Sequence, residues 1–116
     1  MGRVALVTDA IAGAAMPDGA YSVGGRVVET RGGVARAEGG VLAGSTLTMI
    51  EAVRNLHALG ASLAAAIDAA TAVPARVLSE TRVGRLDVGA PADVVVLDDG
   101  LEVERVLVAG EPVFSR

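Results

Sequence analysis

Asp9 is the residue of this sequence whose type and position best suit chemistry. It follows the apolar run Val4–Val7, which is typical of a strand buried on both faces, as in a parallel sheet. Parallel sheets and barrels place their functional polar residues at the carboxyl ends of such strands. A carboxylate held there can accept a proton from a reacting group and return it. The alternative is that Asp9 only caps the loop that follows the strand.

The other polar side chains with chemical potential favour structural interpretations. His57 is the single histidine and the chain has no Cys, so the sequence predicts neither a metal site nor a catalytic triad. We interpret His57 as a surface or interface residue. Asp93 stands where a strand is predicted to begin, and its carboxylate suits bonds to backbone amides there. Arg54 and Arg76 suit ion pairs or helix-end contacts better than phosphate binding.

Composition excludes several classes of function. The chain has 116 residues, 52% of them hydrophobic, which fits one small domain, or a piece of a larger one, that packs a core. A net charge of −4 leaves no basic surface for nucleic acid, and two aromatic residues cannot form a stacking platform. The start of the chain lacks the long apolar segment of a signal peptide. The apolar stretch Leu59–Val73 is too short to span a bilayer. We therefore expect a soluble, cytoplasmic protein without nucleic-acid or membrane partners.

The first half of the chain reads mainly as β-structure. After the strand predicted at Arg3–Val7, a Gly- and Pro-rich loop leads to short hairpin strands within residues 21–37. Paired glycines at 24–25 and 32–33 mark the hairpin turns. Val41–Ser45 is predicted to be a loop that leads into a helix. The strand at Arg3–Val7 has no parallel neighbour within this chain, so it needs partners that the sequence does not supply.

Helices and then strands are predicted for the second half. The first helix is expected over Thr46–Leu59, with Ser45 or Thr46 as its N-cap and Gly60 as its stop. Further helices and strands are predicted at Ser62–Ala70, Pro74–Leu78, Val94–Leu97, Val103–Val108 and Pro112–Phe114.

Several motifs, in this order, resemble the N-acetylglucosamine-6-phosphate deacetylases of the amidohydrolase superfamily. The most specific is Leu42-Ala43-Gly44-Ser45-Thr46-Leu47-Thr48-Met49, and the pattern from Gly84 to Asp98 is similar to the superfamily's tail. The other matching segments are Val7–Ala10, Pro17–Gly19, Arg54–Leu56 and Thr71–Arg76. The resemblance covers nearly the whole chain.

The resemblance implies an α/β fold, namely the C-terminal fragment of a (β/α)₈ TIM-barrel amidohydrolase. Arg3–Val7 would be the last barrel strand. Residues 1–83 would belong to the barrel, with a β-hairpin insertion at 21–37. Residues 84–116 would supply strands of a small β-sandwich.

The resemblance also implies an activity and its residues. The family hydrolyses the acetamido group of N-acetylglucosamine 6-phosphate, giving glucosamine 6-phosphate and acetate. Asp9 would be the catalytic carboxylate, and Leu42, Ala43 and Gly44 would contact the sugar. The divalent metal of the family (Zn or similar) has no ligands in this chain, and the full-length protein is expected to be a homodimer.

Two alternatives remain open. The chain can be a truncated remnant or association module without activity of its own. It can also derive from another amidohydrolase, such as a dihydroorotase-like enzyme, although the Leu42–Met49 stretch argues against this.

Overall fold

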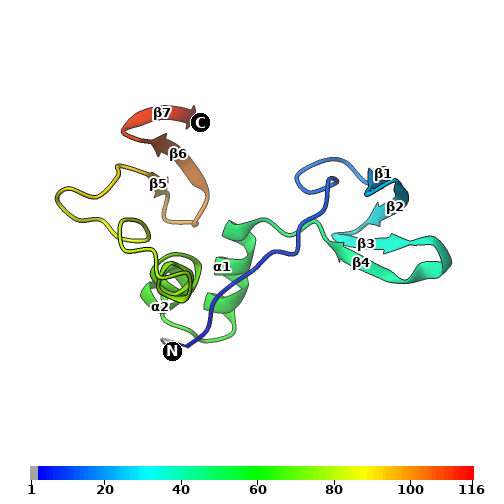
Figure 1. The fold of residues 1–116 in the computed structure, drawn as a ribbon, viewed down its shortest axis with the longest axis horizontal. Coiled ribbons are helices and arrows are strands. Elements are labelled where there is room, and N and C mark those ends of the chain that lie inside the picture. The colour runs from blue at the N-terminus through cyan, green and yellow to red at the C-terminus, as the bar shows by residue number, and fades with distance from the viewer. Residues whose placement is uncertain (1–2) are drawn as a thin grey trace. The chain divides into compact units, whose positions relative to one another are not determined.

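A computed structural model describes residues 3–116 (Figure 1). The chain consists of two compact units. We call Val7–Ala52 the hairpin unit. The chain up to Leu6 and Val53–Arg116 form the second, which we call the helix unit. The domain boundary expected at residue 83 from the resemblance is not tested by this division and stays a prediction.

The hairpin unit contains a four-stranded antiparallel sheet in the order β1-β2-β3-β4. Its first three strands confirm the predicted hairpins: β1 is Gly19–Val23, β2 is Arg26–Arg31 and β3 is Val34–Ala37. Both turns have two residues, and all four of their glycines have φ between 56° and 82°. Tight hairpin turns of this kind need positive φ at both central positions, which explains the paired glycines.

The last strand of this sheet corrects the prediction of a loop at Val41–Ser45. Leu42–Ser45 forms β4, which follows the short 3₁₀ turn η1 (Glu38–Gly40) and pairs antiparallel with β3. Partners shift between Gly44 and Leu42, so that Ala43 is a bulge residue. Gly44 within this strand favoured the loop prediction, because glycine usually weakens β-structure.

The predicted strand at Arg3–Val7 is wrong for this structure. Residues 4–9 have no regular secondary structure, and Val7 is 77% exposed. Residues 3–7 make one backbone hydrogen bond, from Leu6 N to Ala69 O (2.8 Å), and the only ladder contact nearby in the described chain is a parallel bridge between Ala10 and Ser45. A strand requires a hydrogen-bonded neighbour along its length, and none of residues 3–116 supplies one here.

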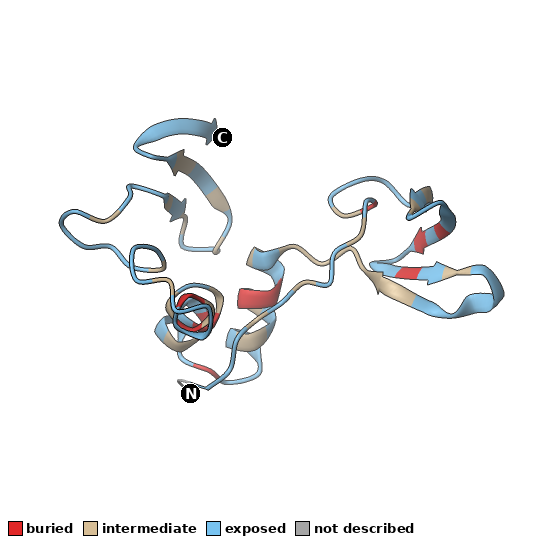
Figure 2. Ribbon diagram, in the orientation of Figure 1, coloured by how far each residue is buried: buried red, intermediate tan, exposed pale blue. Residues whose placement is uncertain are grey.

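The core of the hairpin unit is small. Val28 and Thr30 of β2 and Ala35 of β3 are buried (Figure 2). Gly13 packs on the ring of Tyr21 so closely that an added Cβ would lie 2.7 Å from it. The loop before β1 is therefore held against the sheet by contact rather than by regular structure.

Helix α1 spans Met49–Ala58 and begins later than predicted. Thr48 N donates to Glu51 Oε2 (2.7 Å) and Glu51 N donates to Thr48 Oγ1 (3.4 Å), which together form a capping box. Thr48 is thus the N-cap, in place of Ser45 or Thr46. Gly60 has φ +101° after the helix, as expected for its stop.

The helix unit also contains α2 (Leu63–Ala70), α3 (Ala72–Val77) and a second sheet. Ser62 caps α2 by accepting from Ala65 N (3.2 Å), so the predicted second helix is confirmed. Small buried side chains let these helices pack closely: Ala61, Ala66, Ala69, Val73 and Ala75.

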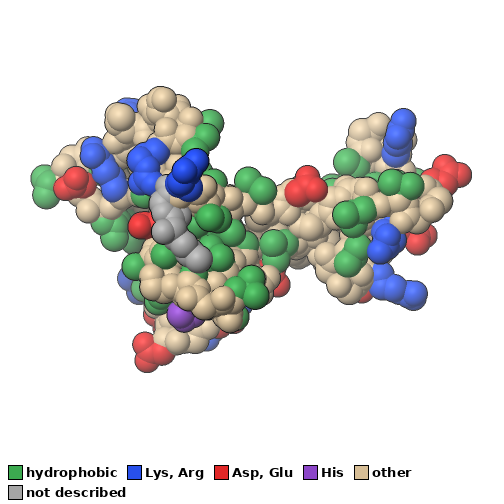
Figure 3. All heavy atoms as spheres, turned by 90° about the horizontal axis from the view of Figure 1, so that it is seen from below, with side chains coloured by type: hydrophobic (Ala, Val, Ile, Leu, Met, Phe, Trp, Pro, Cys, Tyr) green, Lys and Arg blue, Asp and Glu red, His purple; other side chains and the backbone are tan. Residues whose placement is uncertain are grey.

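The C-terminal strands are confirmed as an antiparallel sheet in the order β5-β6-β7. The strands are β5 (Val94–Leu97), β6 (Val103–Val108) and β7 (Glu111–Ser115). Figure 3 shows many apolar side chains at the surface, and Leu59 and Leu86 are 85% and 80% exposed. Among the described residues, no helix has the length and apolarity needed to cross a bilayer.

Candidate functional site

Asp9 lies within the hairpin unit, on a segment held against β4. The backbone carbonyl of Asp9 accepts a hydrogen bond from Ser45 N (2.9 Å). Asp9 is nevertheless an exposed residue. Its φ is +49°, in the left-handed region that few residues other than glycine adopt. Asp tolerates this region better than most residues, but the conformation still has to be held by its surroundings.

Ser45 bonds to the backbone on both sides of Asp9. Ser45 O accepts from Ile11 N (3.0 Å), and Ser45 Oγ donates to Thr8 O (2.5 Å). The same hydroxyl accepts from Leu47 N (3.1 Å). Ser45 therefore connects the Thr8–Ile11 segment to the chain that enters α1.

Gly44 lies directly beside Asp9. A Cβ added to Gly44 would lie 2.9 Å from Asp9 O, 2.7 Å from Ile11 Cγ2 and 3.6 Å from Asp9 Oδ2. Gly44 has φ +122°, which an L side chain rarely adopts. The structure thus brings together two of the predicted site positions, the Asp9 carboxylate and the Gly44 backbone.

The other two predicted substrate contacts belong to the same strand. Leu42 is 66% exposed and Ala43 is half-buried at the bulge. Bulges are frequent beside active sites, where they re-aim a side chain. The predicted contacts therefore lie on an irregular strand that adjoins Asp9, not on a loop.

This arrangement offers one exposed carboxylate and open backbone beside it. Such a group can accept and return a proton. It does not make a metal centre, because no three His, Cys, Asp or Glu side chains within residues 3–116 gather in a way that could hold an ion.

Three other candidates, His57, Asp93 and Arg54, make contacts with the backbone. His57 is exposed on α1 and its Nδ1 lies 2.8 Å from Ala61 O. Asp93 Oδ1 accepts from Ala109 N (2.7 Å), at the hairpin between β6 and β7, as the structural interpretation predicts. Arg54 donates to Leu101 O (2.6 Å from Nη2) and pairs with Glu102 (2.8 Å). Its guanidinium connects α1 to the turn between β5 and β6.

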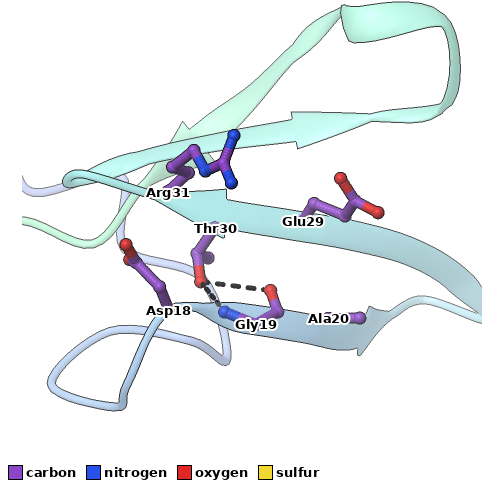
Figure 4. Close-up of a pocket in the computed structure, with 6 residues that line it drawn as sticks. All are labelled: Asp18, Gly19, Ala20, Glu29, Thr30 and Arg31. Atoms are coloured by element: carbon purple, nitrogen blue, oxygen red, sulfur yellow. Dashed lines mark hydrogen bonds between the residues drawn. The ribbon is translucent and has the colours of Figure 1, made fainter.

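A shallow hollow lies elsewhere in the hairpin unit, between β1 and β2 (Figure 4). Its volume is about 380 Å³, and its lining includes Asp18, Thr30 and Arg31. Asp18 Oδ2 accepts a hydrogen bond from Gly32 N (3.0 Å). Thr30 Oγ1 accepts a hydrogen bond from Gly19 N and donates one to Gly19 O. These polar groups hold the hairpin, so we do not assign chemistry to the hollow.

Ser45 is the site residue that sequence reasoning missed. The helical pattern that follows makes Ser45 a natural N-cap candidate, so its hydroxyl was expected to serve α1. A contact with Thr8 joins residues 37 positions apart. Nothing in local spacing indicates such a pair.

A protein family and several known proteins resemble this sequence over nearly its whole length. A sequence model described as the amidohydrolase family matches residues 3–113. The chain is 46% identical over 111 residues to an N-acetylgalactosamine-6-phosphate deacetylase of Escherichia coli O157:H7, covering 94% of this chain and 29% of that protein. It is 37% identical over 115 residues to the N-acetylglucosamine-6-phosphate deacetylase of Vibrio furnissii, covering 97% of this chain and 29% of that protein.

A solved structure is also similar over the whole chain. The N-acetylglucosamine-6-phosphate deacetylase of Thermotoga maritima superposes with a TM-score of 0.90 at 36% identity, over 99% of this chain and 32% of that one. The chain spans less than a third of the length of each of these three proteins. Because the family model extends over almost every described residue, this chain belongs to the amidohydrolase family.

Proposed function

We propose that the protein containing this sequence hydrolyses the acetamido group of N-acetylglucosamine 6-phosphate, giving glucosamine 6-phosphate and acetate. In this proposal the chain acts as part of a longer enzyme with a (β/α)₈ barrel, and residues 84–116 contribute to a β-sandwich. The observation that carries the proposal is the exposed carboxylate of Asp9, held against Gly44 of β4. The names of the similar proteins, which cover nearly all of this chain, supply the substrate class.

Asp9 would move a proton during amide hydrolysis. The attacking water must lose a proton as its oxygen bonds to the acetyl carbon, and the leaving nitrogen must gain one as the C–N bond breaks. One carboxylate can do both, first as base and then as acid. The described residues do not form a metal site, so we derive no step through the divalent metal that the family resemblance implies.

Leu42, Ala43 and Gly44 would contact the sugar. Gly44 has no side chain, so a bound ring can approach the backbone next to the Asp9 carboxylate. Leu42 is largely exposed on the same strand and can cover an apolar face of the ring. This arrangement would place the acetamido group and the proton-transferring group at one end of β4.

A second candidate substrate is the galacto epimer. The relative named for N-acetylgalactosamine 6-phosphate is 46% identical, against 37% for the Vibrio relative and 42% for the Bos taurus relative named for the gluco sugar. Acetate release should therefore be measured with both sugar phosphates. A kcat/KM at least tenfold higher for the galacto epimer would assign that sugar as the substrate.

Replacing Asp9 by asparagine tests the role of the carboxylate. Asparagine keeps the size and tolerates the positive φ, but it cannot exchange the proton. In the native gene product that carries this sequence, we expect kcat to fall by about 10²–10⁴, the usual contribution of general acid–base catalysis, with substrate binding within a few-fold. If Asp9→Asn retains a near-normal kcat, Asp9 is only a loop cap.

A further inference from the structure

We propose that Ser45 is a positioning residue, which holds the Asp9 carboxylate in the place where it exchanges the proton. This inference rests on the proposed function. It adds a residue outside the Leu42–Gly44 contacts and gives the Ser45 hydroxyl a role that the sequence pattern had assigned to capping α1.

Ser45 constrains the backbone before, at and after Asp9. Its hydroxyl donates to Thr8 O at 2.5 Å, its amide donates to Asp9 O at 2.9 Å, and its carbonyl accepts from Ile11 N at 3.0 Å. Asp9 is an exposed residue, and Gly44 approaches its backbone oxygen closely. Ser45 thus determines where the Asp9 Cα lies and in which direction its side chain leaves the backbone.

The left-handed backbone of Asp9 is the reason that such a clamp is needed. A non-glycine residue at φ +49° is strained, and it keeps that conformation only where its surroundings fix it. Bonds on both sides of the residue do this. Without them the segment can relax toward an ordinary conformation, which would turn the carboxylate away from β4.

The hydroxyl is the part of Ser45 that can be removed selectively. The amide and carbonyl bonds remain in any variant, whereas the bond to Thr8 O and the bond from Leu47 N both need Oγ. Threonine keeps an Oγ and valine has the same shape without it. Both are β-branched residues that suit a strand position. Comparing the two variants therefore separates the effect of the hydroxyl from the effect of side-chain volume.

A matched control removes a nearby hydroxyl that serves stability alone. Thr48 caps α1, and its bonds run to Glu51 and not to the Thr8–Ile11 segment. Thr48→Ala should weaken the same region of the chain without releasing Asp9. A loss of activity that Ser45 variants show and Thr48→Ala does not is therefore a loss of positioning.

The experiment measures kcat, KM and Tm in the native gene product that carries this sequence, with N-acetylglucosamine 6-phosphate and its galacto epimer. A displacement of about 1 Å at a catalytic group can cost about 100-fold. We expect Ser45→Val and Ser45→Ala to lower kcat by about 10- to 100-fold with KM within about threefold. Ser45→Thr should stay within about threefold of the unmodified enzyme, and Thr48→Ala should lower Tm with kcat unchanged.

Two results would overturn the inference: a kcat for Ser45→Val that equals that of Ser45→Thr, or a Thr48→Ala variant that loses kcat as much as Ser45→Ala. Should Ser45→Ala not fold, the threonine and valine variants decide alone. An unmodified enzyme that releases no acetate from either sugar phosphate contradicts the proposed function itself, and this outcome is visible before any variant is made.

Discussion

Replacing Gly44 by alanine should displace Asp9 rather than unfold the sheet. The new Cβ would lie 2.9 Å from Asp9 O and 2.7 Å from Ile11 Cγ2, both on the segment that carries the carboxylate. Ordinary van der Waals contact begins at 3.4 Å, so Asp9 O must move by about 0.5 Å from its present 2.9 Å. Active-site groups need to stay within about 0.5 Å of their productive positions, so a shift of this size matters.

The energy of the change can be estimated from two contributions. Alanine at φ +122° adds backbone strain of about 1–3 kcal/mol, and overpacking adds about 1–3 kcal/mol if nothing moves. Moving the Asp9 segment relieves the second contribution at the expense of a few hydrogen bonds. We therefore expect a stability loss of about 2–3 kcal/mol and a fall in kcat of about 10- to 100-fold.

The assay measures urea unfolding and acetate release in the native gene product that carries this sequence. Gly25→Ala is the matched control. Gly25 has φ +78° in the β1–β2 turn, but an added Cβ would have nothing within 4 Å. The control should therefore lose about 1–2 kcal/mol of stability with kcat unchanged. A Gly44→Ala enzyme with kcat within twofold of the unmodified protein would refute the idea that Gly44 sets the position of Asp9.

Other predictions concern the separate parts of the chain. The isolated 116-residue protein should release no acetate with any added divalent metal, because its described residues gather no ligand set; metal-dependent turnover would contradict this. Ala43→Arg should raise KM more than it lowers kcat, by crowding the sugar at the β4 bulge, and unchanged steady-state kinetics would remove Ala43 from the binding surface. Thr48→Ala should lower the free energy of unfolding by about 0.5–2 kcal/mol, as loss of an N-cap does, which denaturant titration can check.

The sequence predicts the elements that depend on local signals. Paired glycines predicted the positions of both tight hairpin turns. Ser62 and the pattern of Leu63–Ala70 predicted the position of α2. Turn geometry and capping act within a few residues, so they can be read from the residues involved. Asp98 shows the same local geometry, because its Oδ1 accepts from Gly100 N two residues further on, whereas the backbone bond predicted for Asp93 reaches Ala109 N, 16 positions away.

The predictions were wrong where contacts between residues far apart in the sequence determine the structure. Apolar residues at 4–7 have the composition of a buried strand, but a strand forms only where another strand supplies partners. β4 forms despite its glycine because β3 is alongside it, and Gly44 is required there by the approach of Asp9. The carboxylate itself could be chosen from its sequence context, whereas the part played by Ser45 depends on a bond across 37 positions.

The meander from β1 to β4 has consequences for the order of folding. Each strand pairs with its neighbour in sequence, and contacts of this kind form quickly because little chain has to be closed. The bridge between Ala10 and Ser45 needs a finished β4, so the segment with Asp9 should dock after the sheet exists. The same segment should also be the first to detach, in a local opening that leaves the hairpins paired. Amide exchange at Ile11 and Ser45 should then be faster than at Val28, so activity can be lost on warming before the sheet melts.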